Sequence, residues 1–256
     1  MVQKIQPAHI NIHQSSDNGR CVLPIVPQTL SDPLSQYALQ LLHMRPSESP
    51  VDDVLREMEK LAARDGIPII GPLEGAMIQM LIQLYQTPPR RVLDIGTAIG
   101  YSAIWLARGL PPESQITSIE IDPERAEMAQ HFISQAGYQD RVRVLVGDVF
   151  ELLPKIENQF DVILQDVIKH IYFGADSQLS LKLLDLCVEY LVAGGVLLGD
   201  NVFCMGEVLH EPSEQVPEQV IGIQAYNDRV ASHPQLHSIA IPIRDGLWVS
   251  RKRANR

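Results

Sequence analysis

The sequence predicts an α/β protein with a doubly wound, mostly parallel seven-stranded sheet, and three observations lead to it. From Arg91 onward, short runs rich in β-branched residues alternate with amphipathic helical stretches, as in βαβ units. A glycine-containing turn, Gly96 to Gly100, directly follows the first run. Five of these runs end at or near an acidic residue. The chain has 256 residues, which is enough for one large domain of this class.

The order of the elements follows from their hydrophobic periodicity. Strands are predicted at residues 91–95, 115–121, 142–146, 160–166, 195–200, 236–243 and 246–251. Helices are predicted between the strands at 102–108, 123–136 and 178–191, with a further helix at 217–232. Asp245-Gly246 separates the last two strands and is typical of a hairpin turn, so we expect an antiparallel C-terminal strand.

The N-terminal part of the chain differs from the rest. Residues 1–30 are polar and interrupted by Pro7, Pro24 and Pro27, so we expect an irregular or partly disordered extension. Residues 31–256 are expected to form a single domain that begins with extra helices. Ser31-Asp32-Pro33 is typical of a helix start, and apolar residues recur at helical spacing in 51–64 and 73–85.

Composition limits the classes of function. The formal net charge of −10 disfavours a broad nucleic-acid footprint. No apolar run approaches the roughly 20 residues that span a bilayer, so no membrane role is expected. The three cysteines, Cys21, Cys187 and Cys204, are far apart and predict neither a disulfide framework nor a cysteine-rich metal site. We therefore expect a cytoplasmic protein.

Acidic residues mark the ends of the five parallel strands, and they are Asp94, Glu120, Asp148, Asp166 and Asp200. Ligands of open α/β sheets bind outside the carboxyl ends of the strands, so these acids should lie along one edge. Acids also cap helices, and that explanation suits Asp122 before Pro123 well. It suits all five poorly, because gathered acids repel each other unless a cation is present. A sulfonium group or a divalent metal ion would supply the positive charge that offsets this repulsion.

The glycine turn predicts a nucleotide-like ligand. Gly96 and Gly100 allow close approach to the backbone, and the following helix N-terminus offers N–H groups to an anion. If the ligand is S-adenosylmethionine, that anion is its methionine carboxylate, with Ser102 as an extra donor. Glu120 lies about 24 residues beyond Gly96, where a carboxylate accepts hydrogen bonds from ribose hydroxyls. The same arrangement also suits NAD, so these residues alone do not identify which nucleotide-like ligand is bound.

The ends of the fourth and fifth strands narrow the chemistry. Asp166, Asp200 and Asn201 form a set of hard oxygen ligands, which suits Mg²⁺ or Ca²⁺ and suits Zn²⁺ poorly. Lys169 lies three residues past Asp166, where the pKa of an amine near a cation is lowered, so that it can accept a proton. A surface Lys–Asp pair beside an Asp-Asn turn is the plainer alternative.

With these residues assembled, the sequence resembles the cation-dependent O-methyltransferases typified by the catechol and caffeoyl-coenzyme-A enzymes. The resemblance runs from about Ser31 to Arg253. The motifs that carry it are Gly71-Pro-Leu-Glu-Gly75, Asp94-Ile-Gly-x-x-x-Gly-Tyr-Ser102, Ile119-Glu-Ile-Asp122, Gly147-Asp148, Asp166-x-x-Lys169-x-x-Tyr172, Gly194-Gly195 and Asp200-Asn-Val-x-x-x-Gly206. It implies a Rossmann-like methyltransferase fold and S-adenosylmethionine as the methyl donor.

The resemblance also implies roles for individual residues. The divalent cation, Mg²⁺ with Ca²⁺ or Mn²⁺ as alternatives, would be held by Asp166, Asp200 and Asn201. The cofactor would be bound by Glu74, Gly75, Asp94, Gly96, Gly100, Ser102, Glu120, Asp148, Val149 and Asp166. Lys169, with Asp166, would be catalytic. The implied reaction is in-line transfer of the methyl group to a phenolic or vicinal-diol small molecule, by a homodimer.

Two departures concern the acceptor. Many members of the family have a second Asp where Ile168 stands, and plant relatives often have Trp at the position of Cys204. Two alternatives stay open at this point. Bacterial relatives include tRNA wobble 5-hydroxyuridine methyltransferases, which would make tRNA a partner although the acidic net charge counts against it. An NAD-dependent oxidoreductase could use the same sheet, but the G-x-x-x-G spacing argues against it.

Overall fold

The computed structural model describes residues 33–44, 49–85, 87–167, 172–173, 178–210 and 217–254. The predicted extension, residues 1–30, lies outside them. The strands are β1 (Arg91–Ile95), β2 (Gln115–Glu120), β3 (Val142–Val146), β4 (Phe160–Gln165), β5 (Leu191–Asp200), β6 (Leu236–Ile241) and β7 (Leu247–Lys252). The helices are α1 (Pro33–His43), α2 (Pro50–Asp65), α3 (Gly71–Gln83), α4 (Tyr101–Gly109), α5 (Pro123–Gln135), α6 (Val149–Leu152), α8 (Gln178–Tyr190) and α9 (Glu218–Ser232). Two 3₁₀ segments, η1 (Leu153–Lys155) and η2 (Cys204–Leu209), complete them.

The sheet has seven strands in the order β3-β2-β1-β4-β5-β7-β6. The strands β1 to β5 pair in parallel, and β7 runs antiparallel to both β5 and β6. This confirms the predicted doubly wound, mostly parallel sheet with an antiparallel C-terminal strand. The strand order reverses direction at β1 and β4, which is where open α/β sheets form a crevice for ligands.

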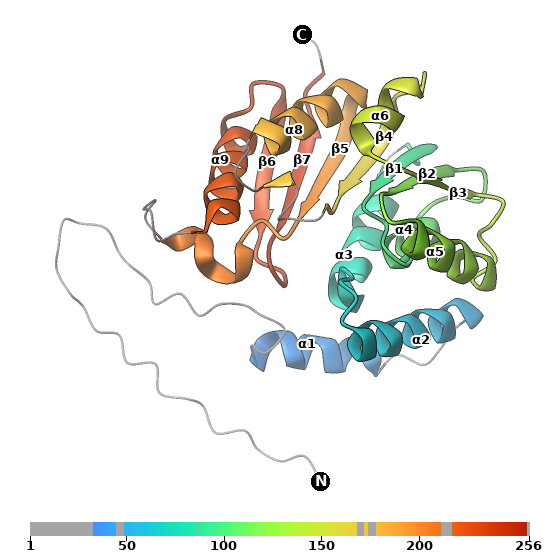
Figure 1. The fold of residues 1–256 in the computed structure, drawn as a ribbon. Helices are drawn as coiled ribbons and strands as arrows, with labels where there is room; N and C mark the ends of the chain where they lie inside the picture. Colours follow the sequence, from blue (N-terminus) through green and yellow to red (C-terminus); the bar gives the residue numbers. More distant parts are fainter. Residues whose placement is uncertain are drawn as a thin grey trace.

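Helices cover both faces of the sheet (Figure 1). One apolar cluster joins α2, α3, α4 and α5 to one face, and the other joins α6, α8 and α9 to the opposite face. Neighbouring strand residues alternate between the clusters, since Val92 belongs to the first and Leu93 to the second. Both are fully buried. Because such a strand is buried on both faces, its sequence is a continuous apolar run and does not alternate between apolar and polar residues.

The first two helices, α1 and α2, differ in how much they contribute to the core. The helix α2 packs against α4 and α5 through Leu55 and Met58, whereas α1 has no buried residue. The capping box of α2 is formed by Ser49, whose backbone N–H donates to the Asp52 side chain. Within the described part of the chain, no helix has both the length and the apolar character needed to cross a membrane.

The structure differs from the predicted elements in a few places. The strand β5 begins at Leu191, four residues before the prediction, and it includes Gly194, which has a φ of 82°. Its register with β4 shifts between Phe160 and Val162. Residues 149–155 and 204–209 form short helical segments that were not predicted, because one or two turns are too short to show a helical period.

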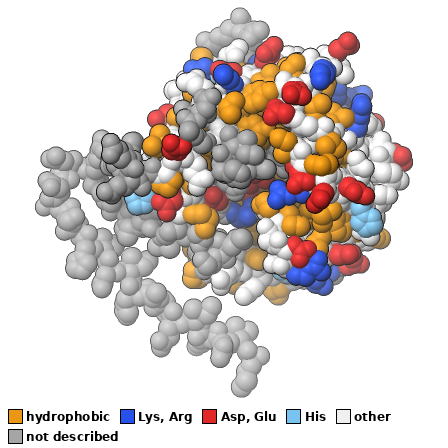
Figure 2. All heavy atoms as spheres, in the orientation of Figure 1, with side chains coloured by type: hydrophobic (Ala, Val, Ile, Leu, Met, Phe, Trp, Pro, Cys, Tyr) orange, Lys and Arg blue, Asp and Glu red, His pale blue; other side chains and the backbone are white. Residues whose placement is uncertain are grey.

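Figure 2 shows acidic and basic side chains interspersed with apolar ones on one face of the molecule. The basic residues on this face therefore do not form one continuous stripe of the kind that binds nucleic acid.

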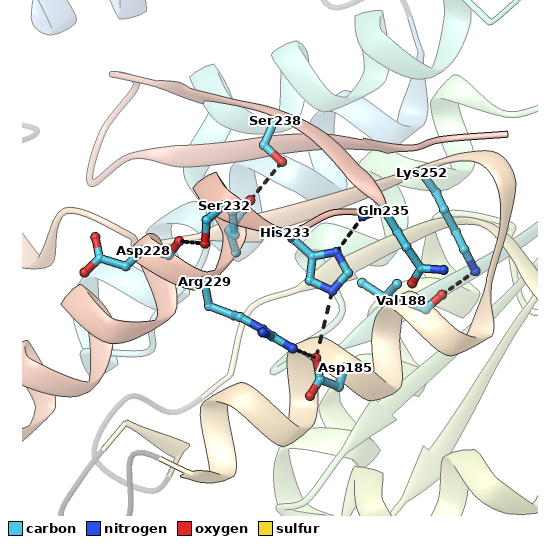
Figure 3. A network of polar contacts seen from close by, with 10 residues as sticks. Asp185, Val188, Asp228, Arg229, Ser232, His233, Gln235, Ser238 and Lys252 are labelled. Carbon is cyan, nitrogen blue, oxygen red and sulfur yellow. Dashed lines mark hydrogen bonds and ion pairs between the residues drawn. The ribbon is translucent and has the colours of Figure 1, made fainter. Parts of the chain in front are cut away.

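A polar network joins α8, α9 and the end of the sheet away from the glycine turn (Figure 3). The Arg229 guanidinium on α9 lies 3.1 Å from Asp185 Oδ1 on α8, and His233 Nε2 lies 4.0 Å from the same oxygen. His233 Nδ1 accepts a hydrogen bond from the backbone N–H of Gln235. Lys252 on β7 donates to the carbonyls that end α8. This network fixes the last helix against the sheet.

Candidate functional site

The parallel strands end along one edge of the sheet, here termed the carboxyl edge, and the predicted acids lie there. Asp94 is the last residue but one of β1, Glu120 ends β2, and Asp200 ends β5. Gln165 pairs with Gly199 in the parallel register of β4 and β5. Asp166 and Asp200 are therefore neighbours across two adjacent strands, as the sequence predicted.

The glycine turn after β1 is shaped by a close backbone contact. Gly96 has a φ of 86°, and a Cβ atom there would lie 1.8 Å from the carbonyl oxygen of Asp166. Its N–H donates to the carbonyl of Ile119 on β2 at 2.8 Å. Gly100, with a φ of 91°, is the N-cap residue of α4. Only glycine fits at Gly96, since both the φ angle and the contact exclude a side chain.

Asp94 lies beneath this turn and is fully buried. Ser102 on α4 and Ser118 on β2 each donate a hydrogen bond to its Oδ2 at 3.0 Å. Burial raises the pKa of Asp94 to about 6, although these hydrogen bonds oppose the shift. Asp94 and Ser102 thus hold the start of α4 against β1 and β2.

Glu120 faces the turn from the end of β2 and is 4% exposed. Its Oε2 accepts a hydrogen bond from the N–H of Ala98 at 2.8 Å, and its Oε1 accepts one from the N–H of Asp122 at 3.0 Å. Two backbone donors therefore hold the carboxylate at the carboxyl edge. Each oxygen retains a second lone pair for a ligand hydroxyl.

A cavity of about 320 Å³ opens beside the turn. Its lining residues are Pro68, Ile95, Gly96, Ala98, Ile119, Glu120, Ile121, Arg125, Gly147, Val149, Asp166, Val167, Tyr172 and Asn201. Five predicted site residues are among them, namely Gly96, Glu120, Val149, Asp166 and Asn201. The cavity thus brings three of the predicted nucleotide-binding residues, Gly96, Glu120 and Val149, to one space with two of the predicted metal ligands.

Other predicted site residues lie around the cavity without lining it. Gly75 on α3 packs against Trp105, since a Cβ atom there would lie 2.5 Å from the indole ring. Asp148 caps α6 and accepts a hydrogen bond from the N–H of Phe150 at 2.7 Å. Asp122 caps α5 as expected. The capping explanation that the sequence left open therefore applies to Asp148 as well.

Three carboxylates gather at the β4 and β5 end of the carboxyl edge. Glu74, Asp166 and Asp200 are here termed the acid cluster. Glu74 on α3 has no exposed surface, and burial followed by the nearby Asp200 carboxylate raises its pKa well above the usual range. Asp166 acts in the same direction. The Arg244 Nη1 lies 3.1 Å from Glu74 Oε2 and opposes the shift.

The donor atoms of this region fit a hard divalent cation. Asp166 and Asp200 supply carboxylate oxygens, and Asn201, which has a φ of 56°, places an amide beside the cavity. Glu74 Oε1 is buried and has no hydrogen-bond partner among the described residues. No group of three His, Cys, Asp or Glu side chains in the described residues is arranged as a metal site. The predicted set combines two carboxylates with an amide and so differs from such a group.

Some predicted residues and some unpredicted ones complete the site. Lys169 and Ile168 lie outside the described residues, so the predicted base stays a prediction. Tyr172, which ended the D-x-x-K-x-x-Y motif without an assigned role, lines the cavity and is 4% exposed. The D-x-x-K-x-x-Y motif was therefore a sequence signal that could have placed Tyr172 at the site. Arg125 and Arg244 carried no such signal, because nothing in their local sequence marks a contact with Glu74 or the cavity.

Known proteins resemble this chain over most of its length. The O-methyltransferase family model matches residues 46–253. A catechol O-methyltransferase of Niastella koreensis is 31% identical over 182 residues, covering 69% of this chain and 77% of that protein. A caffeoyl-CoA O-methyltransferase of Populus kitakamiensis is 28% identical, covering 90% and 98%.

A solved structure resembles this chain both in fold and in sequence. The O-methyltransferase of Bacillus cereus in complex with SAH superimposes with a TM-score of 0.70 and 29% identity, covering 88% of this chain and 98% of that chain. The family model spans more than half of this chain. The chain therefore belongs to the O-methyltransferase family, and it is an S-adenosylmethionine-dependent O-methyltransferase.

Proposed function

We propose that this protein methylates one hydroxyl of a catechol or similar vicinal-diol small molecule in a reaction that depends on a divalent cation. The observation that carries the proposal is the meeting of two residue sets at one cavity. Gly96 and Glu120 line it on the nucleotide side, and Asp166 and Asn201 line it on the metal side. One space is thus available to a methyl donor and a metal-associated acceptor.

Each set has a distinct task in the proposed reaction. Glu120 would accept hydrogen bonds from the ribose of the methyl donor, and the bare backbone at Gly96 would allow its close approach. Asp166, Asp200 and Asn201 would hold the cation. A bound cation would supply positive charge that favours the deprotonated acceptor hydroxyl. Lys169, which lies outside the described residues, stays the predicted proton acceptor.

Positioning would account for most of the rate gain. Gly96 sits against the Asp166 carbonyl, so the nucleotide turn and the first proposed metal ligand are in direct contact. A donor and an acceptor held by these two segments would therefore be aligned by the backbone itself. Apolar residues such as Ile95, Val149 and Val167 line the same cavity and would limit the access of water.

The acceptor class is supported by the relatives. Those reported above are a catechol and a caffeoyl-CoA O-methyltransferase, and the acceptors in both names are phenolic. Two adjacent oxygens suit a hard cation that keeps positions open beyond its three protein ligands. The formal net charge of −10 favours a small molecule over tRNA.

The test is a methyl-transfer assay on the full-length protein with S-adenosylmethionine. Catechol, caffeoyl-CoA and 5-hydroxyuridine-containing tRNA are offered as acceptors, each with Mg²⁺ and with a chelator. We expect methylation of a diol acceptor that Mg²⁺ supports and the chelator abolishes. Equal turnover in chelator would remove the metal from the proposal, and turnover of tRNA alone would replace the acceptor. Sedimentation of the same sample would test the predicted homodimer.

A further inference from the structure

The turn between β6 and β7 places one cation at the acid cluster. Arg244 occupies this turn with a φ of 49°. Its Nη1 donates to Glu74 Oε2 at 3.1 Å, and only 13% of its side chain is exposed. A Cβ atom at Gly71 would lie 3.4 Å from the Arg244 Nε, so the guanidinium lies close against the start of α3. Arg244 is therefore a buried ion-pair partner of Glu74.

The same turn is attached to the segment that follows the proposed metal ligands. The Asp245 carbonyl accepts a hydrogen bond from the N–H of Phe203 at 2.8 Å, and the Asp245 side chain accepts one from the N–H of Met205. Gly246 lies against the Phe203 ring, where a Cβ atom would come within 2.6 Å. The position of Arg244 is thus linked by the backbone to that of Asp200 and Asn201.

Arginine keeps its charge at any pH relevant to the protein. A buried carboxylate group without a cation is costly, so Arg244, whose Nη1 lies 3.1 Å from Oε2 of the fully buried Glu74, stabilises that carboxylate. A divalent cation at Asp166, Asp200 and Asn201 would be drawn to the same negative charges. Two cations that share one cluster of carboxylates repel each other, so their stabilising effects cannot simply add.

We propose that Arg244 is the resident counter-ion of the acid cluster, which lets the cluster be buried before a metal binds and in return weakens the affinity for that metal. The inference rests on the metal site of the proposed function. The coupling is reciprocal, because a group that weakens metal binding is itself destabilised when the metal is present.

The test measures Mn²⁺ binding to the full-length protein by calorimetry, without methyl donor or acceptor. We expect Arg244→Met to bind Mn²⁺ at least about fivefold more tightly than the wild type. Arg244→Lys, which keeps a positive charge, should lie closer to the wild type. Arg91→Met is the matched control. It removes an exposed arginine from the opposite end of β1 and should leave the affinity within about twofold of the wild type.

A second pair of variants covers the case in which Arg244→Met fails to fold. Glu74→Gln removes the paired charge, so Glu74→Gln with Arg244→Met is compared with Glu74→Gln alone, and the same tightening is expected. Unchanged or weaker Mn²⁺ binding on loss of Arg244 would overturn the inference while the metal site stands. Absence of Mn²⁺ binding in the wild type would overturn both.

Discussion

The two ends of the carboxyl edge hold their acids in different ways. At the end proposed for the methyl donor, here termed the nucleotide end, Glu120 accepts hydrogen bonds from two backbone N–H groups and Asp94 accepts them from Ser102 and Ser118. At the end proposed for the cation, here termed the metal end, Glu74 lies beside Asp200 and Asp166. The acids of the nucleotide end are therefore held by neutral donors of the chain, whereas the three carboxylates of the acid cluster lie close to each other.

The difference indicates what each end is suited to bind. Carboxylates that already hold backbone donors are fixed in place and can present their remaining lone pairs to hydroxyl groups. Carboxylates that lie close together raise each other's proton affinity and attract a cation. The proposed nucleotide end is thus held by hydrogen bonds from the chain, whereas at the proposed metal end Arg244 compensates the charge of Glu74.

The largest effect is expected at the metal end, from Asp200→Ala. Loss of one of three proposed ligands should reduce kcat/KM by at least about a thousandfold, since metal ions contribute several kcal/mol of charge stabilisation. The measurement is methyl transfer at saturating Mg²⁺. Asp228→Ala, an exposed change on α9, is the control. Wild-type turnover by Asp200→Ala in chelator would contradict the comparison at its metal end.

The contact between the two ends is tested by Gly96→Ala. The new Cβ would meet the Asp166 carbonyl at 1.8 Å, so we expect a loss of roughly 4 kcal/mol in the free energy of unfolding. Gly137→Ala is the control. Gly137 has a similar φ of 76° but no atom within 4 Å of its Cβ position, so only about 1 kcal/mol should be lost. Equal losses in urea denaturation would show that the contact is unimportant.

The nucleotide end is tested by Glu120→Gln. An amide can replace only part of the carboxylate's interactions with Ala98, Asp122 and the ligand, so we expect the affinity for S-adenosylmethionine to fall by about 2 kcal/mol. Calorimetry measures this loss, with Glu124→Gln on the exposed surface of α5 as the matched variant. An equal affinity in both variants would remove Glu120 from the nucleotide site.

The smallest effect is expected far from both ends, at the network of Figure 3. Burial lowers the pKa of His233 from 6.5, Arg229 and Lys252 add to the shift, and Asp185 opposes it. The folded state thus favours neutral imidazole, so its stability is full above about pH 6.5 and declines as the pH falls toward the folded pKa. Urea denaturation at pH 7.5 and 5.5 should show a smaller loss for His233→Gln. An identical loss in both proteins would assign it to other groups.

Much of the fold was predictable because its signals are local. The strands β1 and β3 have the predicted bounds, and the Asp245-Gly246 pair does connect two antiparallel strands. Residues 149–155 and 204–209 escaped prediction, since segments of one or two turns depend on capping and on distant contacts. One such contact is the hydrogen bond from Phe203 to Asp245.

The candidate site could be predicted from the sequence where local motifs mark its residues, and could not be predicted where it depends on tertiary packing. The sequence by itself determined the glycine turn, the acids that end the strands and the Asp200-Asn201 pair, because a parallel sheet places all strand ends at one edge. Only the tertiary structure decided that Arg244 meets Glu74, 170 positions earlier in the chain. That pairing depends on how α3 and the β6–β7 turn pack around the sheet, and no local pattern records such a contact.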